Sequence, residues 1–203
     1  MEIFLVTAPG LEHHLAAEAT GLGLNVTDCS PGGVTLNGTQ KDVVIANMHL
    51  RGAVRVLVRL TSFRAMHLAQ LDKRARKLPW ADWLRADVPL KVDAVCRKSR
   101  IYHHKAAAQR IEGALRDLLG VQIDKGAKLV LKVRIEDDLC TLSIDSSGEA
   151  LHKRGIKQQV NKAPMRETMA ALFLRACGYD GAGPVYDPMC GSGTFPIEAA
   201  EVA

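Results

Sequence analysis

Residues 187–194 (DPMCGSGT) combine an acid, two glycines and two hydroxyls in an order that suits cofactor binding. The apolar pair Val185-Tyr186 precedes them and an alanine-rich segment follows, which predicts a strand, a tight turn and a helix. Gly191 and Gly193 let the backbone turn tightly and let a ligand approach without a Cβ in the way. The following helix would direct its first N–H groups at that ligand.

The same turn indicates which cofactor it suits. A phosphate-binding loop needs a lysine after its last glycine, and a dinucleotide fingerprint needs a third glycine where Pro196 stands. Asp187 would repel phosphate but would accept hydrogen bonds from an ammonium group, so the turn favours S-adenosylmethionine. We expect Cys190 to be a small packing residue and not a nucleophile. The residues expected to line the pocket are Asp187, Pro188, Cys190, Gly191, Ser192, Gly193 and Thr194. Helix N-capping by Ser192 and Thr194 is compatible with that role.

The formal net charge of +5 is unevenly distributed. Residues 51–77 and 91–134 each carry a net charge of +7 and residues 151–178 carry +5, whereas residues 1–50 carry −4. Basic blocks on one surface attract polyanions such as RNA, although an ordinary solvated surface is the alternative. The sequence has no run of 18 apolar residues and no basic amphipathic helix with aromatic anchors, so we expect no membrane partner.

The five cysteines are widely spaced and form no CxxC pair. Structural zinc needs clustered ligands, so we expect no metal site. Free thiols fit a reducing compartment, and the first residues lack a secretory signal, so we expect a cytoplasmic protein.

The hydrophobic pattern predicts two successive α/β units. Residues 2–60 are predicted to form strand, helix, two strands, helix and strand, the order of a ferredoxin-like fold. The second unit is predicted to contain a helix, a strand at 89–99, a helix at 101–120 and a final hairpin. We expect Leu118 to face the core from that helix. Tyr102 could either stack on a base or fill the core, and we expect it to fill the core because aromatic residues are few.

Several segments together resemble one family. DPMCGSGT resembles the first S-adenosylmethionine motif of the THUMP-containing RNA guanine-N2 methyltransferases, a group that includes the bacterial large-subunit ribosomal RNA enzyme. LHKRGIK at 151–157 and APMRETMAA at 163–171 resemble segments that precede this motif in the family, with Ile156 where an aromatic is usual. RKSRIYH at 97–103 and DSSG at 145–148 resemble two stretches of THUMP modules.

The resemblance implies a mixed α+β and α/β architecture in three parts. These are a ferredoxin-like domain at 1–60, a THUMP RNA-binding domain at 61–155, and at 156–203 a linker with the start of a truncated Rossmann-like methyltransferase domain. The helix before the cofactor turn would border the pocket through Pro164, Met165, Glu167 and Thr168, although Glu167 suits the first turn of any helix equally well. The implied partner is structured RNA, ribosomal RNA before transfer RNA. The expected RNA contacts are Lys98, Arg100, Lys105, Arg110, Lys153 and Arg154, with a solvated surface or a braced linker as the alternative.

The implied reaction is methyl transfer from S-adenosylmethionine to the exocyclic N2 of a guanine, which requires the base to leave its helix. In the family an [ND]-P-P-[YF] motif holds that base, and no Pro-Pro pair occurs in the 203 residues. We therefore assign no catalytic residue and expect the chain to be the inactive N-terminal part of a longer enzyme. The alternatives are a transfer RNA guanine-N2 methyltransferase and a non-catalytic RNA-binding protein.

Overall fold

The computed structural model describes residues 1–153 and 164–203. These residues form two compact units, one of residues 1–57 with 149–203 and the other of residues 58–148. The boundary falls within the long strand β4 (Arg55–Arg64), so the chain enters the second unit without a loop.

The first unit begins with the predicted strand and helix pattern. Its first elements are β1 (Glu2–Val6), α1 (Glu12–Gly21), β2 (Val26–Ser30), β3 (Gly33–Asn37), α2 (Gln40–His49) and the start of β4. The strand order is β2-β3-β1-β4, and β3 pairs antiparallel with both β1 and β2. This order confirms the ferredoxin-like prediction.

Alternate residues of the strands and one face of α1 build the core of this unit. Ile3, Leu5, Leu15 and Leu36 are fully buried or nearly so. Beside this core, the Glu12 carboxylate accepts hydrogen bonds from the backbone N–H of Gly32 at 2.7 Å and of Gly10 at 2.8 Å. The Gly32 N–H is the main reason that the pKa of Glu12 lies below its ordinary value.

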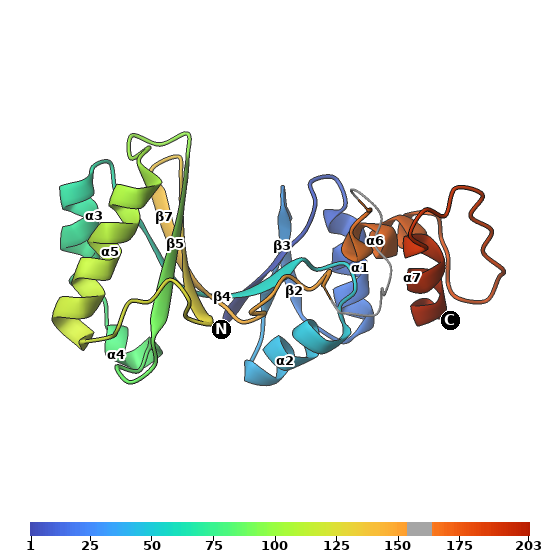
Figure 1. Ribbon diagram of the computed structural model, residues 1–203, viewed down its shortest axis with the longest axis horizontal. Coiled ribbons are helices and arrows are strands. Elements are labelled where there is room, and N and C mark those ends of the chain that lie inside the picture. Colours follow the sequence, from blue (N-terminus) through green and yellow to red (C-terminus); the bar gives the residue numbers. More distant parts are fainter. Residues whose placement is uncertain (154–163) are drawn as a thin grey trace. The chain divides into compact units, whose positions relative to one another are not determined.

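The second unit is a helix-covered sheet. After β4 it contains α3 (Leu68–Ala75), α4 (Trp80–Trp83), β5 (Leu90–Arg97), α5 (His104–Leu119), β6 (Leu129–Glu136) and β7 (Leu139–Asp145). β5 and β6 are parallel and joined through α5, whereas β6 and β7 form an antiparallel hairpin. α3 and α5 pack side by side over one face of the sheet (Figure 1).

The core of the second unit confirms most of the predicted inward residues. Trp80 is 2% exposed, and its indole N–H donates to the Ala75 carbonyl at 2.8 Å. The prediction for Leu118 was wrong, since this side chain is 52% exposed. In the last turn of α5 the neighbouring Leu119 packs against the core instead. None of the described helices is long and apolar enough to cross a membrane.

Two further helices belong to the first unit, α6 (Glu167–Ala176) and α7 (Thr194–Val202). The strand predicted at Val185-Tyr186 is absent from the described residues, and Tyr186 is 89% exposed. A strand requires neighbours that satisfy its backbone hydrogen bonds, and no described strand pairs with these two residues. The glycine-rich turn and the helix after it are present as predicted.

Candidate functional site

The turn before α7 has the backbone geometry that its glycines suggest. Gly191 and Gly193 have φ angles of 54° and 71°, in the left-handed region that favours glycine. The Gly193 N–H donates to the Cys190 carbonyl at 2.7 Å, and the Met189 N–H donates to Asp187 Oδ1 at 3.0 Å. A Cβ on Gly191 or Gly193 would meet no atom nearer than 3.9 Å, so the space beside these glycines is open.

α7 begins directly at this turn, with Gly193 as its N-cap. Pro196 occupies the first turn of the helix, where its missing N–H has no intrahelical partner to lose. The first N–H groups of α7 therefore lie beside the turn, as the sequence predicted for a ligand-binding helix.

The segment before α6 lies beside the turn. The Thr194 hydroxyl donates to the Met165 carbonyl at 3.5 Å, so two residues predicted for the same pocket meet. Thr168 is 1% exposed, and its Oγ1 has no hydrogen-bond partner among the described residues. A buried hydroxyl without a partner is costly and suits a position next to a ligand.

The other predicted pocket residues are less enclosed. Pro164, Pro188 and Cys190 are exposed, while Asp187, Ser192 and Glu167 are partly buried. Cys190 was expected to be a small packing residue, and its thiol is free and exposed. Glu167 stands in the first turn of α6, which agrees with its alternative interpretation as an acid favoured by the helix dipole.

A second group of predicted residues surrounds the loop between β5 and α5. Lys98 has a φ of 45°, unusual for a residue other than glycine. Asp138 holds the loop, since its Oδ1 accepts from the Ser99 hydroxyl at 2.8 Å and from the Arg100 N–H at 2.9 Å. The Arg100 backbone, followed by the Ser99 hydroxyl, lowers the pKa of Asp138 below its ordinary value. The carboxylate is thus held in its charged form, which fixes the loop.

The four basic residues predicted in the second unit all reach solvent. Lys98 and Arg100 are exposed in the loop, and Lys105 and Arg110 are exposed on α5. Arg110 lies five residues after Lys105, about 7.5 Å further along the helix axis. The group therefore extends from the loop along the first half of α5.

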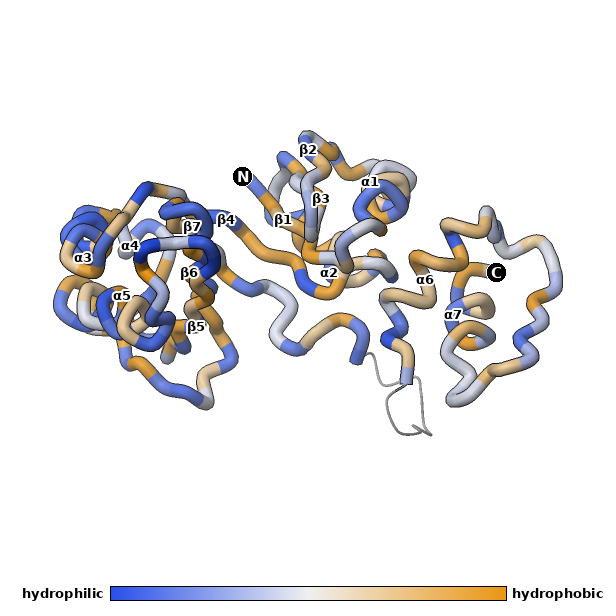
Figure 2. Tube along the Cα trace, turned by 90° about the horizontal axis from the view of Figure 1, so that it is seen from above, coloured by the Kyte–Doolittle hydropathy of each residue, from blue (hydrophilic) through white to orange (hydrophobic). Residues whose placement is uncertain are grey.

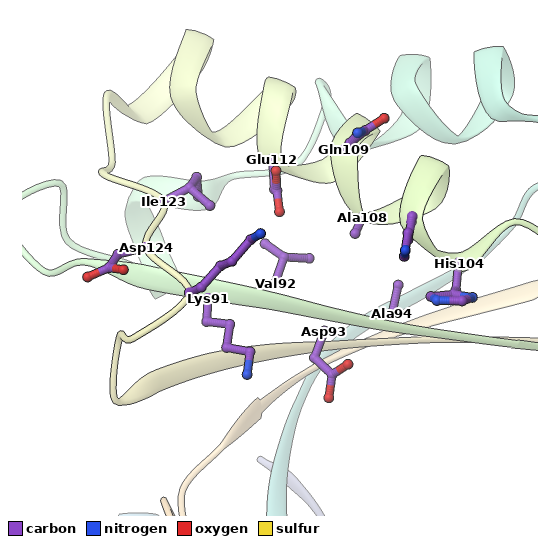
Figure 3. A pocket seen from close by; sticks show the side chains of 12 residues that line it. Lys91, Val92, Asp93, Ala94, His104, Ala108, Gln109, Glu112, Ile123 and Asp124 are labelled. Carbon is purple, nitrogen blue, oxygen red and sulfur yellow. The ribbon is translucent and has the colours of Figure 1, made fainter.

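A groove of about 450 Å³ lies between α5 and β5 and begins at the same end of the helix (Figure 3). Val92 and Ala94 of β5 face Ala108 of α5 across it, His104 lies at one end and Asp124 at the other. Lysines and acids both line the groove, so its charge is mixed while the loop beside it is basic. Sequence reasoning missed this groove, because it depends on small side chains meeting across two elements.

Tyr102 was predicted to fill the core, and this was wrong, because the side chain is 71% exposed. The preceding Ile101 is 3% exposed and takes the core position instead. The Tyr102 ring lies against the His103 ring, with centroids 4.2 Å apart. An aromatic ring thus stands exposed between Arg100 and Lys105.

The segment 151–153 carries the remaining predictions. Lys153 is exposed and lies 3.9 Å from Glu149, a weak surface ion pair that leaves it accessible. Arg154 lies outside the described residues. His152 Nδ1 is buried without a hydrogen-bond partner, and burial, followed by the charge of Arg166, lowers the pKa of this imidazole. The described residues contain no group of three potential metal ligands.

Comparison with family models assigns each part of the chain. An RlmL ferredoxin-like domain matches residues 2–57, a THUMP domain matches 65–145, and the methyltransferase domain described as RMKL-like matches 154–203. The chain thus has the domain order of a THUMP-containing methyltransferase. The three matches follow one another in the order that the sequence motifs implied, and they confirm the predicted fold class.

Relatives of this THUMP-containing chain include curated ribosomal RNA methyltransferases. It is 34% identical to the "Ribosomal RNA large subunit methyltransferase K/L" of Syntrophotalea carbinolica, over 97% of this chain and 29% of that protein. The protein of the same name from Vibrio cholerae is 32% identical, over 98% of this chain and 29% of its own length. The chain thus spans less than a third of these relatives.

Several solved structures share its fold. A Listeria monocytogenes protein described as a predicted N6-adenine-specific DNA methylase is 34% identical, with a TM-score of 0.90 over 99% of this chain and 55% of that one. SMU.472, described as "a putative methyltransferase complexed with SAH", is 26% identical with a TM-score of 0.88, over 99% of this chain and 55% of that one. TrmN of Thermus thermophilus, at 24% identity and a TM-score of 0.79, shows the shared fold.

Proposed function

We propose that this chain is the RNA-binding and cofactor-turn portion of an S-adenosylmethionine-dependent methyltransferase that modifies the exocyclic N2 of a guanine in ribosomal RNA. The order of ferredoxin-like, THUMP and methyltransferase matches supports this proposal most strongly, together with the names of the ribosomal RNA relatives. Action on ribosomal RNA would take place in the cytoplasm.

The cofactor half of the proposal rests on how well the turn suits S-adenosylmethionine, which supplies the methyl group when bound. Asp187 offers a carboxylate at the start of the turn, and the left-handed glycines keep its inner side free of Cβ atoms. Thr168 adds a buried hydroxyl without a described partner near Met165 and Thr194. These residues would bind and orient the cofactor, and the relative SMU.472 was solved with SAH.

The RNA half of the proposal rests on the loop before α5. Its basic residues are exposed, its backbone is held by Asp138, and it presents Tyr102 to solvent. Lysine and arginine supply contacts to phosphate, and exposed aromatic rings stack on unpaired bases. The site would therefore suit RNA in which a paired region adjoins unpaired nucleotides. Lys153 and Arg154 would extend the contact beyond the THUMP domain.

Two measurements test this function. The chain is expected to bind large-subunit ribosomal RNA with an affinity that falls steeply between about 50 and 200 mM salt, and to transfer no methyl group by itself, because it lacks the [ND]-P-P-[YF] motif. The full product of its gene is expected to form N2-methylguanosine in that RNA, detected by nucleoside analysis. N6-methyladenine in DNA would instead support the activity named for the Listeria relative.

A transfer RNA substrate is the second candidate, because a protein surface that recognises the shape of structured RNA does not by itself select ribosomal RNA. Competition between ribosomal and transfer RNA for the chain separates the two. If RNA is bound but neither ribosomal nor transfer RNA is methylated by the full gene product, the protein would be a non-catalytic RNA-binding protein.

Replacing Tyr102 with alanine is expected to weaken binding to RNA with an unpaired flank by about 5- to 150-fold, since stacking contributes about 1–3 kcal/mol per base. Tyr102→Phe keeps the ring and should bind nearly as the wild type does. Fluorescence anisotropy measures both variants against a blunt duplex of equal length. Leu118→Ala serves as the control, because it also removes an exposed apolar side chain from this unit. Equal losses on the flanked RNA and the blunt duplex would contradict stacking.

A further inference from the structure

The loop after α2 contacts α7 within the first unit through the charged side chain of Arg51. Arg51 follows α2 and is separated from α7 by more than 140 residues in sequence. Its guanidinium donates to Glu198 in two parallel hydrogen bonds, Nε to Oε2 at 3.1 Å and Nη2 to Oε1 at 2.8 Å. A third bond joins Nη1 to Glu201 at 3.3 Å. α7 is thus held by a fork that fits one carboxylate.

This ion pair is largely removed from water. The Glu198 side chain is 1% exposed and that of Arg51 is 14% exposed. A buried carboxylate that loses its cationic partner is strongly unfavourable, whereas an exposed pair contributes little. Glu198 is also one of the few polar residues on a helix that is otherwise largely hydrophobic (Figure 2).

Glu18 of α1 holds Arg51 in place from the other side. Its Oε1 accepts from the Arg51 backbone N–H at 2.9 Å, and its Oε2 accepts from the Gly52 N–H at 3.0 Å. Arg175 of α6 donates to the same carboxylate at 3.3 Å. The Glu18 side chain is 2% exposed, so a buried carboxylate holds the backbone from which the Arg51 side chain extends to α7.

Gly52 allows these elements to approach closely. A Cβ at this position would lie 2.8 Å from Leu172 Cγ of α6 and 3.0 Å from Glu18 Oε2. Leu172 is 1% exposed and belongs to the same core as Ile3 and Leu15 of the ferredoxin-like domain. The contact is therefore a packed interface with a charged pair at its edge.

We propose that Arg51 is a positioning residue, through which the ferredoxin-like domain holds α7 and the cofactor turn at its N-terminus. Glu198 lies one turn after Thr194, where α7 begins, so the ion pair restrains the helix whose first residue directly follows the turn. Its relevance to the cofactor rests on the proposed function, whereas the restraint on α7 does not. The domain before the THUMP module would then be part of the cofactor site and more than a spacer.

Hydrogen exchange of the 203-residue chain, followed by mass spectrometry, tests the restraint. Arg51→Ala is expected to speed exchange of α7 amides by on the order of 100-fold, while β1, β3 and β5–β7 keep their protection. Arg51→Lys keeps the charge but loses the fork, so it should give an intermediate increase. The exchanged pair R51E/E198R should recover part of the protection, a result that simple loss of packing would not produce.

The matched control is Arg85→Ala, which removes an equally forked pair with Asp87 in which Arg85 is 76% exposed. It should leave α7 exchange unchanged. Unchanged α7 exchange in Arg51→Ala would overturn the proposal, and so would an equal loss of protection throughout the chain, which would mean that Arg51 only stabilises the fold. Neither result depends on whether the protein binds S-adenosylmethionine, so failure here is distinct from failure of the proposed function.

Discussion

Replacing Lys98, Arg100, Lys105 and Arg110 together with alanine is expected to weaken RNA binding on the order of 1,000-fold at 0.1 M salt. All four side chains are exposed, and each phosphate that a basic side chain neutralises releases counterions. The slope of log affinity against log salt should therefore become shallower by about 1 for each phosphate that is no longer neutralised. Anisotropy titrations of the chain with ribosomal RNA at several salt concentrations measure both quantities.

A control must separate local binding at this loop from the general loss of positive charge. Lys41 and Arg85 are exposed bases that lie outside the three basic blocks. The double variant K41A/R85A should retain near wild-type affinity, whereas K98A/K105A should bind about 10- to 100-fold more weakly. Equal effects of the two pairs would show that RNA recognises total charge and not the loop before α5.

The second large effect is expected on stability. Gly52→Ala should lower the free energy of unfolding of the first unit by about 1–3 kcal/mol, because the new methyl group must displace a packed leucine. That leucine, Leu172, is 1% exposed and has little room to move, and Glu18 blocks the other side. Urea denaturation followed by circular dichroism measures the loss.

Gly21→Ala provides the comparison, since a Cβ there would meet nothing within 4 Å and Gly21 lies in α1 of the same unit. This change should be neutral or slightly stabilising. If the two alanine variants unfolded at the same urea concentration, the close approach at Gly52 would not limit stability.

Local patterns predicted the ferredoxin-like and THUMP elements well, because each strand and helix carries its own periodicity. Gly120, for example, ends α5 in the left-handed region, as its position at the end of the predicted helix suggests. The glycine-rich turn before α7 was also recognisable, since left-handed glycines and a helix start are local properties. The prediction of a strand at 185–186 was wrong, because a strand also needs adjacent strands that form hydrogen bonds with its backbone.

The features that sequence reasoning missed depend on interactions between distant residues. Nothing in the sequence near Arg51 marks Glu198 as its partner, and nothing around Gly52 reveals Leu172. Tyr102 was assigned to the core because the chain has few aromatic residues, but Ile101 already fills that position. These choices are decided by packing, which a single sequence does not display.

The tight turn between β6 and β7 has a consequence for the entropy of binding. Asp137 and Asp138 have φ angles of 49° and 62°, a conformation that glycine would adopt with less strain. Asp138 uses this position to anchor Ser99 and Arg100. Local strain in the hairpin thus holds the basic loop in one conformation, so the loop loses little conformational entropy when it binds a ligand.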